Sequence, residues 1–170
     1  MKQILFYFTL MILFATCIDD ENAVAMRVVN FDERTANIQL IDSLITGKTY
    51  LPVYSHIYHF DNNTTHSLTV TISMRNISPS DTIYVQSANY YNTYGEWIRE
   101  YLQHPIYLSP LETVEIVINA KDREGGSGAN FVFDWAVHSE KNLPLFESVM
   151  ISTSGQQGLS FSSRGVRIYD

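Results

Sequence analysis

The sequence predicts an all-β domain built as an antiparallel β-sandwich. Apolar and polar residues alternate with a period of two in several short segments, as they do in strands with one buried face. Turn-forming residues separate these segments, and no segment shows the sustained period of a long helix. Many short strands at this spacing favour two sheets with immunoglobulin-like Greek-key connections. A single sheet closed on itself remains the alternative, because it has the same period.

About eight strands are expected. The clearest is 68–75, where leucine, valine, isoleucine and methionine alternate with threonine, serine and arginine. The same alternation recurs at 113–119 and 130–138. Short apolar runs predict further strands at 50–60, 82–91, 96–102, 145–151 and 159–168. Asp61-Asn62-Asn63 and Ser154-Gly155 are among the turn signals between them.

Residues 1–16 have the layout of a signal peptide. Lys2 precedes an apolar run at 4–15 that is interrupted only by Thr9. The run is shorter than the roughly 20 residues that a permanent membrane-spanning helix needs. We therefore expect this segment to be cleaved and the chain to be exported.

Cys17 is the only cysteine in the chain. It follows Ala15-Thr16 at the end of the apolar run, a position that resembles the lipobox of bacterial lipoproteins. Lipidation of Cys17 would consume a thiol that is otherwise unpaired in an oxidising compartment, and it would anchor the chain to a membrane. The alternative is an ordinary signal peptide that is cleaved further on, near Ala23 or Ala25, and carries Cys17 away.

Three parts follow from this interpretation. They are a lipoprotein signal peptide at 1–16, the lipidated Cys17 with a flexible tether at 17–47, and the β-sandwich domain at 48–170. The expected location is the cell envelope, as an outer membrane lipoprotein that faces the periplasm or the cell surface. The formal net charge of −7 makes nucleic acid a poor partner. No motif predicts a cofactor.

The most unusual local feature is the glycine loop, residues 122–130, which holds three glycines in four positions. Backbone amides there could bind an anion, and Asp122, Glu124 and Asn130 could offer oxygens to a cation. A loop that is glycine-rich for conformational reasons is the simpler explanation. Ser127 is not expected to be a nucleophile, because a strand and not a helix follows it.

Tyr94 lies in a predicted tight turn before Gly95, where side chains usually project into solvent. Together with Trp97 or Tyr90 it could form a platform for a sugar ring or for a partner's apolar side chain. The sequence thus predicts a ligand-binding site that includes the following residues: Tyr94, Trp97, Asp122, Gly125, Gly126, Ser127, Gly128 and Asn130.

The histidines predict neither a metal site nor a catalytic residue by their spacing. The closest pair, His56 and His59, should point to opposite faces of a strand. His56 and His138 could still converge from neighbouring strands, with Asp134 nearby. This leaves an alternative function, a metal- or anion-dependent envelope enzyme or carrier that uses these residues and the glycine loop.

Several strings of residues resemble an uncharacterised bacterial family, domain of unknown function 3124. They include Leu108-Ser109-Pro110-Leu111-Glu112 and Gly125-Gly126-Ser127-Gly128-Ala129-Asn130-Phe131, within residues 48–139. The resemblance implies an exported, sandwich-like domain and carries no established activity. The leading hypothesis is therefore a non-enzymatic envelope lipoprotein that binds a protein or a glycan.

Overall fold

The computed structural model describes residues 29–153 and 158–169, so the predicted signal peptide and Cys17 lie outside the described residues. Twelve strands and three 3₁₀ turns make up this part of the chain. In order they are η1 (Asp32–Arg34), η2 (Ile38–Leu40), β1 (Ile45–Val53), β2 (His56–His59), β3 (Asp61–Ser67), β4 (Thr69–Arg75), β5 (Ile83–Tyr91), β6 (Trp97–Glu100), β7 (Ile106–Leu108), β8 (Thr113–Ile118), η3 (Gly126–Gly128), β9 (Ala129–Val137), β10 (Leu145–Ser152), β11 (Leu159–Arg164) and β12 (Val166–Ile168).

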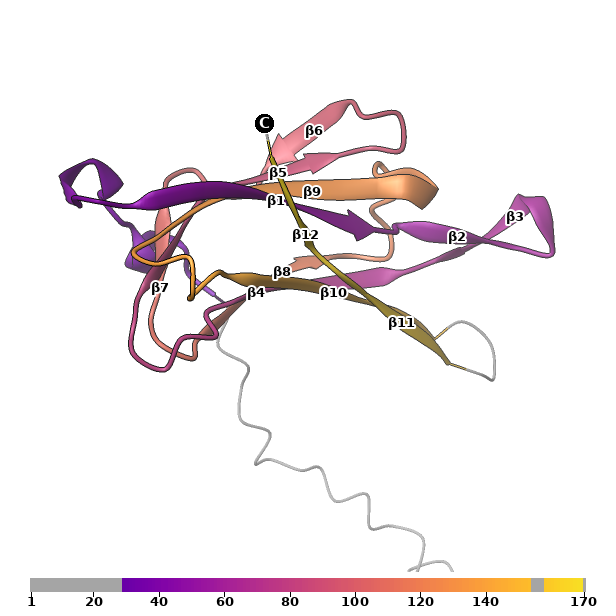
Figure 1. Ribbon diagram of the computed structural model, residues 1–170. Coiled ribbons are helices and arrows are strands. Elements are labelled where there is room, and N and C mark those ends of the chain that lie inside the picture. The colour runs from indigo at the N-terminus through magenta and orange to yellow at the C-terminus, as the bar shows by residue number, and fades with distance from the viewer. Residues whose placement is uncertain (1–28, 154–157, 170) are drawn as a thin grey trace, which may run out of the picture.

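The strands form two sheets that pack face to face, together with a projecting hairpin (Figure 1). The six-stranded sheet has the order β12-β1-β9-β5-β6, and β7 pairs with β5. The four-stranded sheet has the order β11-β10-β4-β8, and the hairpin consists of β2 and β3. All pairings between these strands are antiparallel. This confirms the predicted all-β sandwich.

The count of about eight strands was too low. The expected strand at 50–60 is divided at Tyr54-Ser55 into β1 and β2, and the one at 159–168 is divided at Gly165 into β11 and β12. The predicted turn at 61–63 is instead the start of β3, and the chain turns one residue earlier at Phe60, where φ is +63°. The three-residue strand β7 is too short to show a period.

Gly165 lets the chain cross from one sheet to the other. Its amide donates to the carbonyl of Phe146 at 2.8 Å. A Cβ atom at this position would lie 2.6 Å from Cγ2 of Thr49 and 3.2 Å from the Phe146 carbonyl oxygen. Only glycine therefore fits, and β11 pairs with β10 in one sheet while β12 pairs with β1 in the other.

Aromatic rings fill the space between the sheets. Phe133 of the six-stranded sheet stacks on Phe146 of the four-stranded sheet, with ring centroids 4.2 Å apart. Phe131 continues the stack at 5.4 Å from Phe133. Trp135 is buried beside them, and its Nε1 donates to Oγ1 of Thr49 at 2.9 Å. The period-two residues predicted to face inward thus form one continuous core.

The sandwich has two distinct ends, which the pairing of β1 with β9 defines. Val53 pairs with Ala129 at the hairpin end, next to β2, β3 and the glycine loop. Ile45 pairs with Val137 at the other end, which we call the tether end. Figure 1 shows the hairpin projecting from one end of the sandwich and η1 near β7 toward the other.

The last part of the predicted tether lies against the sandwich. Phe31 packs on the core, and Arg34 forms an ion pair with Glu112 at 2.7 Å. Thr35 forms a β-bridge with Ile106. β1 begins at Ile45, slightly before the expected domain start at 48. Across the described ranges, no helix has the length and apolar character needed to cross a membrane.

Candidate functional site

Three separate segments meet around a hollow of about 150 Å³ at the hairpin end. β2 contributes His56 and Tyr58, the loop between β5 and β6 contributes Tyr94, and the glycine loop forms the remaining wall. The fold therefore brings the predicted residues Tyr94, Gly125, Gly126 and Ser127 together.

Backbone hydrogen bonds fasten the glycine loop to its neighbours. The amide of Thr93 donates to the carbonyl of Gly125 at 3.0 Å, and the amide of Gly128 donates to Oγ1 of Thr93 at 2.9 Å. The amide of Ser55 donates to the carbonyl of Gly126 at 3.0 Å. The loop is thus tied both to the β5–β6 turn and to the β1–β2 junction.

Close packing explains why glycine occupies two of these positions. A Cβ atom at Gly125 would lie 1.9 Å from the hydroxyl oxygen of Tyr90, and Gly126 has a φ of +78°. Glycine is the residue that tolerates both the contact and the left-handed backbone. Ser127 is followed directly by β9, so it has the strand and not the helix that a nucleophile elbow requires.

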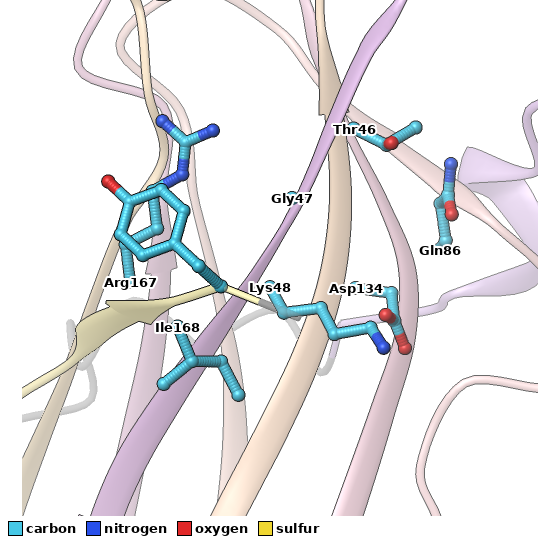
Figure 2. A pocket seen from close by; sticks show the side chains of 8 residues that line it. Thr46, Gly47, Lys48, Gln86, Asp134, Arg167 and Ile168 are labelled. Atoms are coloured by element: carbon cyan, nitrogen blue, oxygen red, sulfur yellow. The ribbon is translucent and has the colours of Figure 1, made fainter.

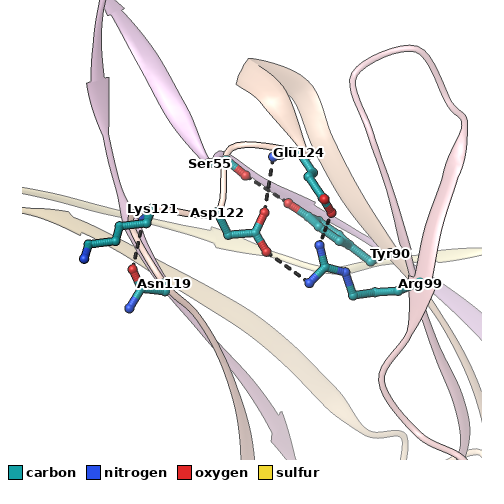
Figure 3. Close-up of polar contacts among 7 residues, drawn as sticks. All are labelled: Ser55, Tyr90, Arg99, Asn119, Lys121, Asp122 and Glu124. Carbon is teal, nitrogen blue, oxygen red and sulfur yellow. Dashed lines mark hydrogen bonds and ion pairs between the residues drawn. The ribbon is translucent and has the colours of Figure 1, made fainter.

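A charged cluster beneath the loop holds it in place (Figure 3). Arg99 of β6 forms ion pairs with Asp122, at 3.1 Å, and with Glu124. The other oxygen of Asp122 accepts a hydrogen bond from the amide of Glu124 at 3.2 Å. Both carboxylate oxygens of Asp122 are engaged within the protein, so this residue supports the loop.

Tyr90 supports the same loop from the core side. Its buried hydroxyl lies 2.9 Å from Oγ of Ser55, and its ring stacks on Phe131 with centroids 4.8 Å apart. Burial raises the pKa of Tyr90 to about 12, because the phenolate would lose its hydration. Tyr90 is therefore neutral at physiological pH and acts as a hydrogen-bonded packing residue.

Exposed aromatic side chains lie on two walls of the hollow, at Tyr58 and Tyr94, and at the tip of the hairpin. Tyr94 is 87% exposed, Tyr58 60% and Phe60, at the tip of the hairpin, 94%. His56 is half-buried, and its Nδ1 atom has no hydrogen-bond partner among the described residues. Burial, followed by the nearby charge of Arg123, lowers the pKa of His56, so its ring is neutral at pH 7.

Two predicted site residues lie elsewhere. Trp97 and Asn130 both flank Tyr91 in the ladder, on the outer face of the six-stranded sheet. Neither residue lines the hollow at Tyr94. They belong to the hairpin end of the sheet but form part of a different surface.

The histidines do not form the alternative metal site. His56 follows β1 at the hairpin end, whereas His138 follows β9 at the tether end. The nine residues of β9 span roughly 26 Å, since a strand rises about 3.3 Å per residue. Asp134 lies between the two ends and accepts a hydrogen bond from Ser87 at 2.6 Å. Within the described ranges, no group of three or more His, Cys, Asp or Glu residues is placed to hold a metal ion.

One histidine contact was missed from the sequence. The rings of His59 and His66 lie 4.1 Å apart between centroids, because β2 and β3 form a hairpin. The predicted turn at 61–63 placed the reversal of the chain one position too late, so this pairing could not be derived from spacing.

A second hollow, of about 350 Å³, lies between β12 and the outer face of the six-stranded sheet (Figure 2). Lys48, Asp134 and Arg167 are among the residues that line it. Arg167 is 3.5 Å from Glu140, and its guanidinium lies over the rings of Trp135 and Tyr169. Lys48 also has an interaction partner. Each of these three charged residues thus has at least one partner within the protein, although Nε of Arg167 has no hydrogen-bond partner among the described residues.

No curated protein matches the chain. The crystal structure of Thermotoga maritima 1070 is similar at 7% identity with a TM-score of 0.43, over 71% of this chain and 92% of that one. The family model described as "Protein of unknown function (DUF3124)" matches residues 46–168, which include eleven of the strands completely and almost all of β1. The chain belongs to this family.

Proposed function

We propose that the protein is a non-enzymatic lipoprotein of the bacterial cell envelope that binds a partner protein through its hairpin end. The observation that carries this proposal is the group of exposed aromatic rings at Tyr58, Phe60 and Tyr94. Large aromatic residues that protrude into solvent are typical anchors of protein interfaces. The fastened glycine loop behind them supplies a rigid support, which reduces the entropic cost of binding.

The position of the tether supports an anchored arrangement. Residues 29–41 pack at the tether end, and the aromatic rings lie at the hairpin end. A chain anchored through Cys17 would therefore turn its aromatic residues away from the membrane. Lipidation is tested by mass spectrometry of the N-terminal peptide from membrane fractions. Acylated Cys17 supports the anchor, and an unmodified chain that begins after Cys17 refutes it.

Binding is tested with photo-crosslinking residues placed in the full-length chain in intact cells. We expect crosslinkers at positions 58, 60 and 94 to give a discrete product with one protein. Crosslinkers at Val117 and Val149, exposed on the outer face of the four-stranded sheet, are the matched controls. Equal products from both sets, or none from the hairpin end, would contradict the proposal.

The affinity for the identified partner then tests the residues themselves. We expect Phe60→Ser and Tyr94→Ala to weaken binding about tenfold or more, as the loss of a protruding aromatic anchor does. Val149→Ala provides the control, because its side chain lies on the outer face of the opposite sheet. An unchanged affinity in both aromatic variants would place the contact elsewhere.

A further inference from the structure

The outer face of the six-stranded sheet carries a row of side chains that crosses four strands. Pro52 of β1 pairs with Asn130 of β9, Asn130 with Tyr91 of β5, and Tyr91 with Trp97 of β6. Three steps between neighbouring strands span about 14 Å, since strands lie about 4.8 Å apart. We call this row, together with the adjacent Asn89, the Trp97 face.

Trp97 is both exposed and held in one orientation. Its side chain is 58% exposed, and its Nε1 donates to Oδ1 of Asn89 at 2.8 Å. Asn89 in turn donates to Oγ of Ser87 at 3.3 Å. An indole that is fixed by its edge presents its ring to solvent without a further loss of side-chain entropy on binding.

The charged residues close to the Trp97 face already have partners. Glu100 accepts hydrogen bonds from the amides of Ala88 and Leu102, at 2.5 and 3.1 Å. Glu96 accepts one from the side chain of Asn92 at 2.8 Å. A ligand would therefore meet aromatic rings, amide groups and two carboxylates that are already hydrogen-bonded to neutral donors. The negative charge of these carboxylates disfavours an anionic ligand.

The opposite outer face provides a contrast. On the four-stranded sheet, β4 turns Thr69 and Thr71 outward, and Val117, Val149 and Ile151 are the exposed apolar residues beside them. In the described part of that sheet, no aromatic ring points outward. The outward-pointing aromatic rings of the Trp97 face are thus a feature of the six-stranded sheet and not of both sheets.

We propose that the Trp97 face is a binding site for a neutral glycan. A sugar ring has an apolar C–H face that packs on an indole, while its hydroxyl groups donate to and accept from side-chain amides. The row is long enough for an extended oligosaccharide, with one ring on Trp97 and its neighbours along Tyr91 and Asn130. The site lies on a different surface from the hollow at Tyr94 and the hairpin tip, and it does not depend on the proposed protein contact there.

The chain offers a direct spectroscopic test, because it contains two tryptophans and only one of them is exposed. Trp97 is 58% exposed, whereas Trp135 is 1% exposed. The purified full chain is titrated with cellohexaose, chitohexaose and mannohexaose, and with polygalacturonate as the anionic comparison. We expect saturable binding of at least one neutral hexasaccharide, with a shift of tryptophan emission to shorter wavelength.

Variants distinguish this face from the other surfaces. Trp97→Ala should weaken calorimetrically measured binding about tenfold or more and remove the emission shift. Asn89→Ala should weaken it by a smaller factor, because the indole loses its fixed orientation. Val117→Ala and Phe60→Ser should bind like the wild type, since they alter the other sheet and the hairpin tip.

Three results would overturn the proposal. They are the absence of binding to all three neutral hexasaccharides, an unchanged affinity in Trp97→Ala, and preferential binding of polygalacturonate. Failure of the protein-binding proposal would leave this test intact, because Phe60→Ser affects only the hairpin end.

Discussion

The loops at both ends of the sandwich are held by hydrogen bonds from polar side chains, but the two ends differ in what they expose to solvent. At the tether end, polar side chains point inward and satisfy backbone groups, as Asn76 does for the loops around it. At the hairpin end, Arg99 and Tyr90 likewise form polar contacts that support the glycine loop, but aromatic rings there are exposed to solvent. The difference indicates that the loops of the tether end stabilise the fold, while the hairpin end has the same internal support and also an exposed aromatic surface.

The largest expected effect is at the tether end, in Asn76→Ala. Its buried amide nitrogen lies 2.7, 3.0 and 2.9 Å from the carbonyl oxygens of Asp81, Leu108 and Ser109. Removing it leaves buried carbonyl groups unsatisfied, which should lower the free energy of unfolding by about 3 kcal/mol or more. Chemical denaturation measures this change. Asn62→Ala, at an exposed position of β3, is the control and should change stability by less than about 0.5 kcal/mol.

Gly125→Ala tests whether the hairpin end is as tightly built. The added Cβ would lie 1.9 Å from the Tyr90 hydroxyl and 2.7 Å from Cβ of Ala129. We therefore expect overpacking to lower the free energy of unfolding by about 2 kcal/mol. Gly158→Ala is the matched control, because its nearest contact would be 3.9 Å away. Equal melting temperatures for the two variants would show that the glycine loop rearranges to accommodate the added methyl group at little cost in stability.

Tyr90 adds an alkaline pH dependence to the hairpin end. Its pKa is about 12 in the folded protein and near 10 when unfolded, so folding disfavours loss of the proton. The associated stability is complete below pH 10 and is lost as the pH rises through 12, by about 2 kcal/mol in total. The free energy of unfolding, measured by chemical denaturation at a series of pH values from 8 to 12, should therefore fall more steeply with pH for the wild type than for Tyr90→Phe. Tyr94→Phe should retain the wild-type slope.

The smallest effect on stability is expected for Phe60→Ser. The ring is 94% exposed, so its loss should change the free energy of unfolding by less than about 0.5 kcal/mol. The same substitution is expected to weaken partner binding, which would separate a binding role from a folding role. A decrease of more than about 1 kcal/mol in the free energy of unfolding would mean that the Phe60 ring packs on the domain in solution.

Sequence patterns predicted those parts of the fold that depend on one buried face. β4 and β9 were found because their side chains alternate between core and solvent. β3 was missed because its first residues, Asp61-Asn62-Asn63, have turn-forming side chains and are fully exposed in a hairpin that projects from the sandwich. Gly165 could not be read as a crossing point, because its contacts with Thr49 and Phe146 come from distant strands.

The candidate site was predicted only in part, for a related reason. Local turn chemistry correctly indicated that Tyr94 would be exposed. It could not show that Thr93 ties that turn to the glycine loop, or that Trp97 faces a different surface, because both depend on strand register. A β-bulge between Tyr90 and Tyr91 further shifts the register of β6.

The pairing of β1 with β9 has a mechanical consequence. Residues 29–41 connect to the tether-end terminus of β1, and this strand pairs with β9 along nine residues toward the hairpin. In an anchored chain, tension between the membrane and a partner at the hairpin end would run along these strands. Because β1 continues through Tyr54-Ser55 into the hairpin, such a load would act along the strand direction. A load in this direction strains the hydrogen bonds between neighbouring strands together and does not open them one after another.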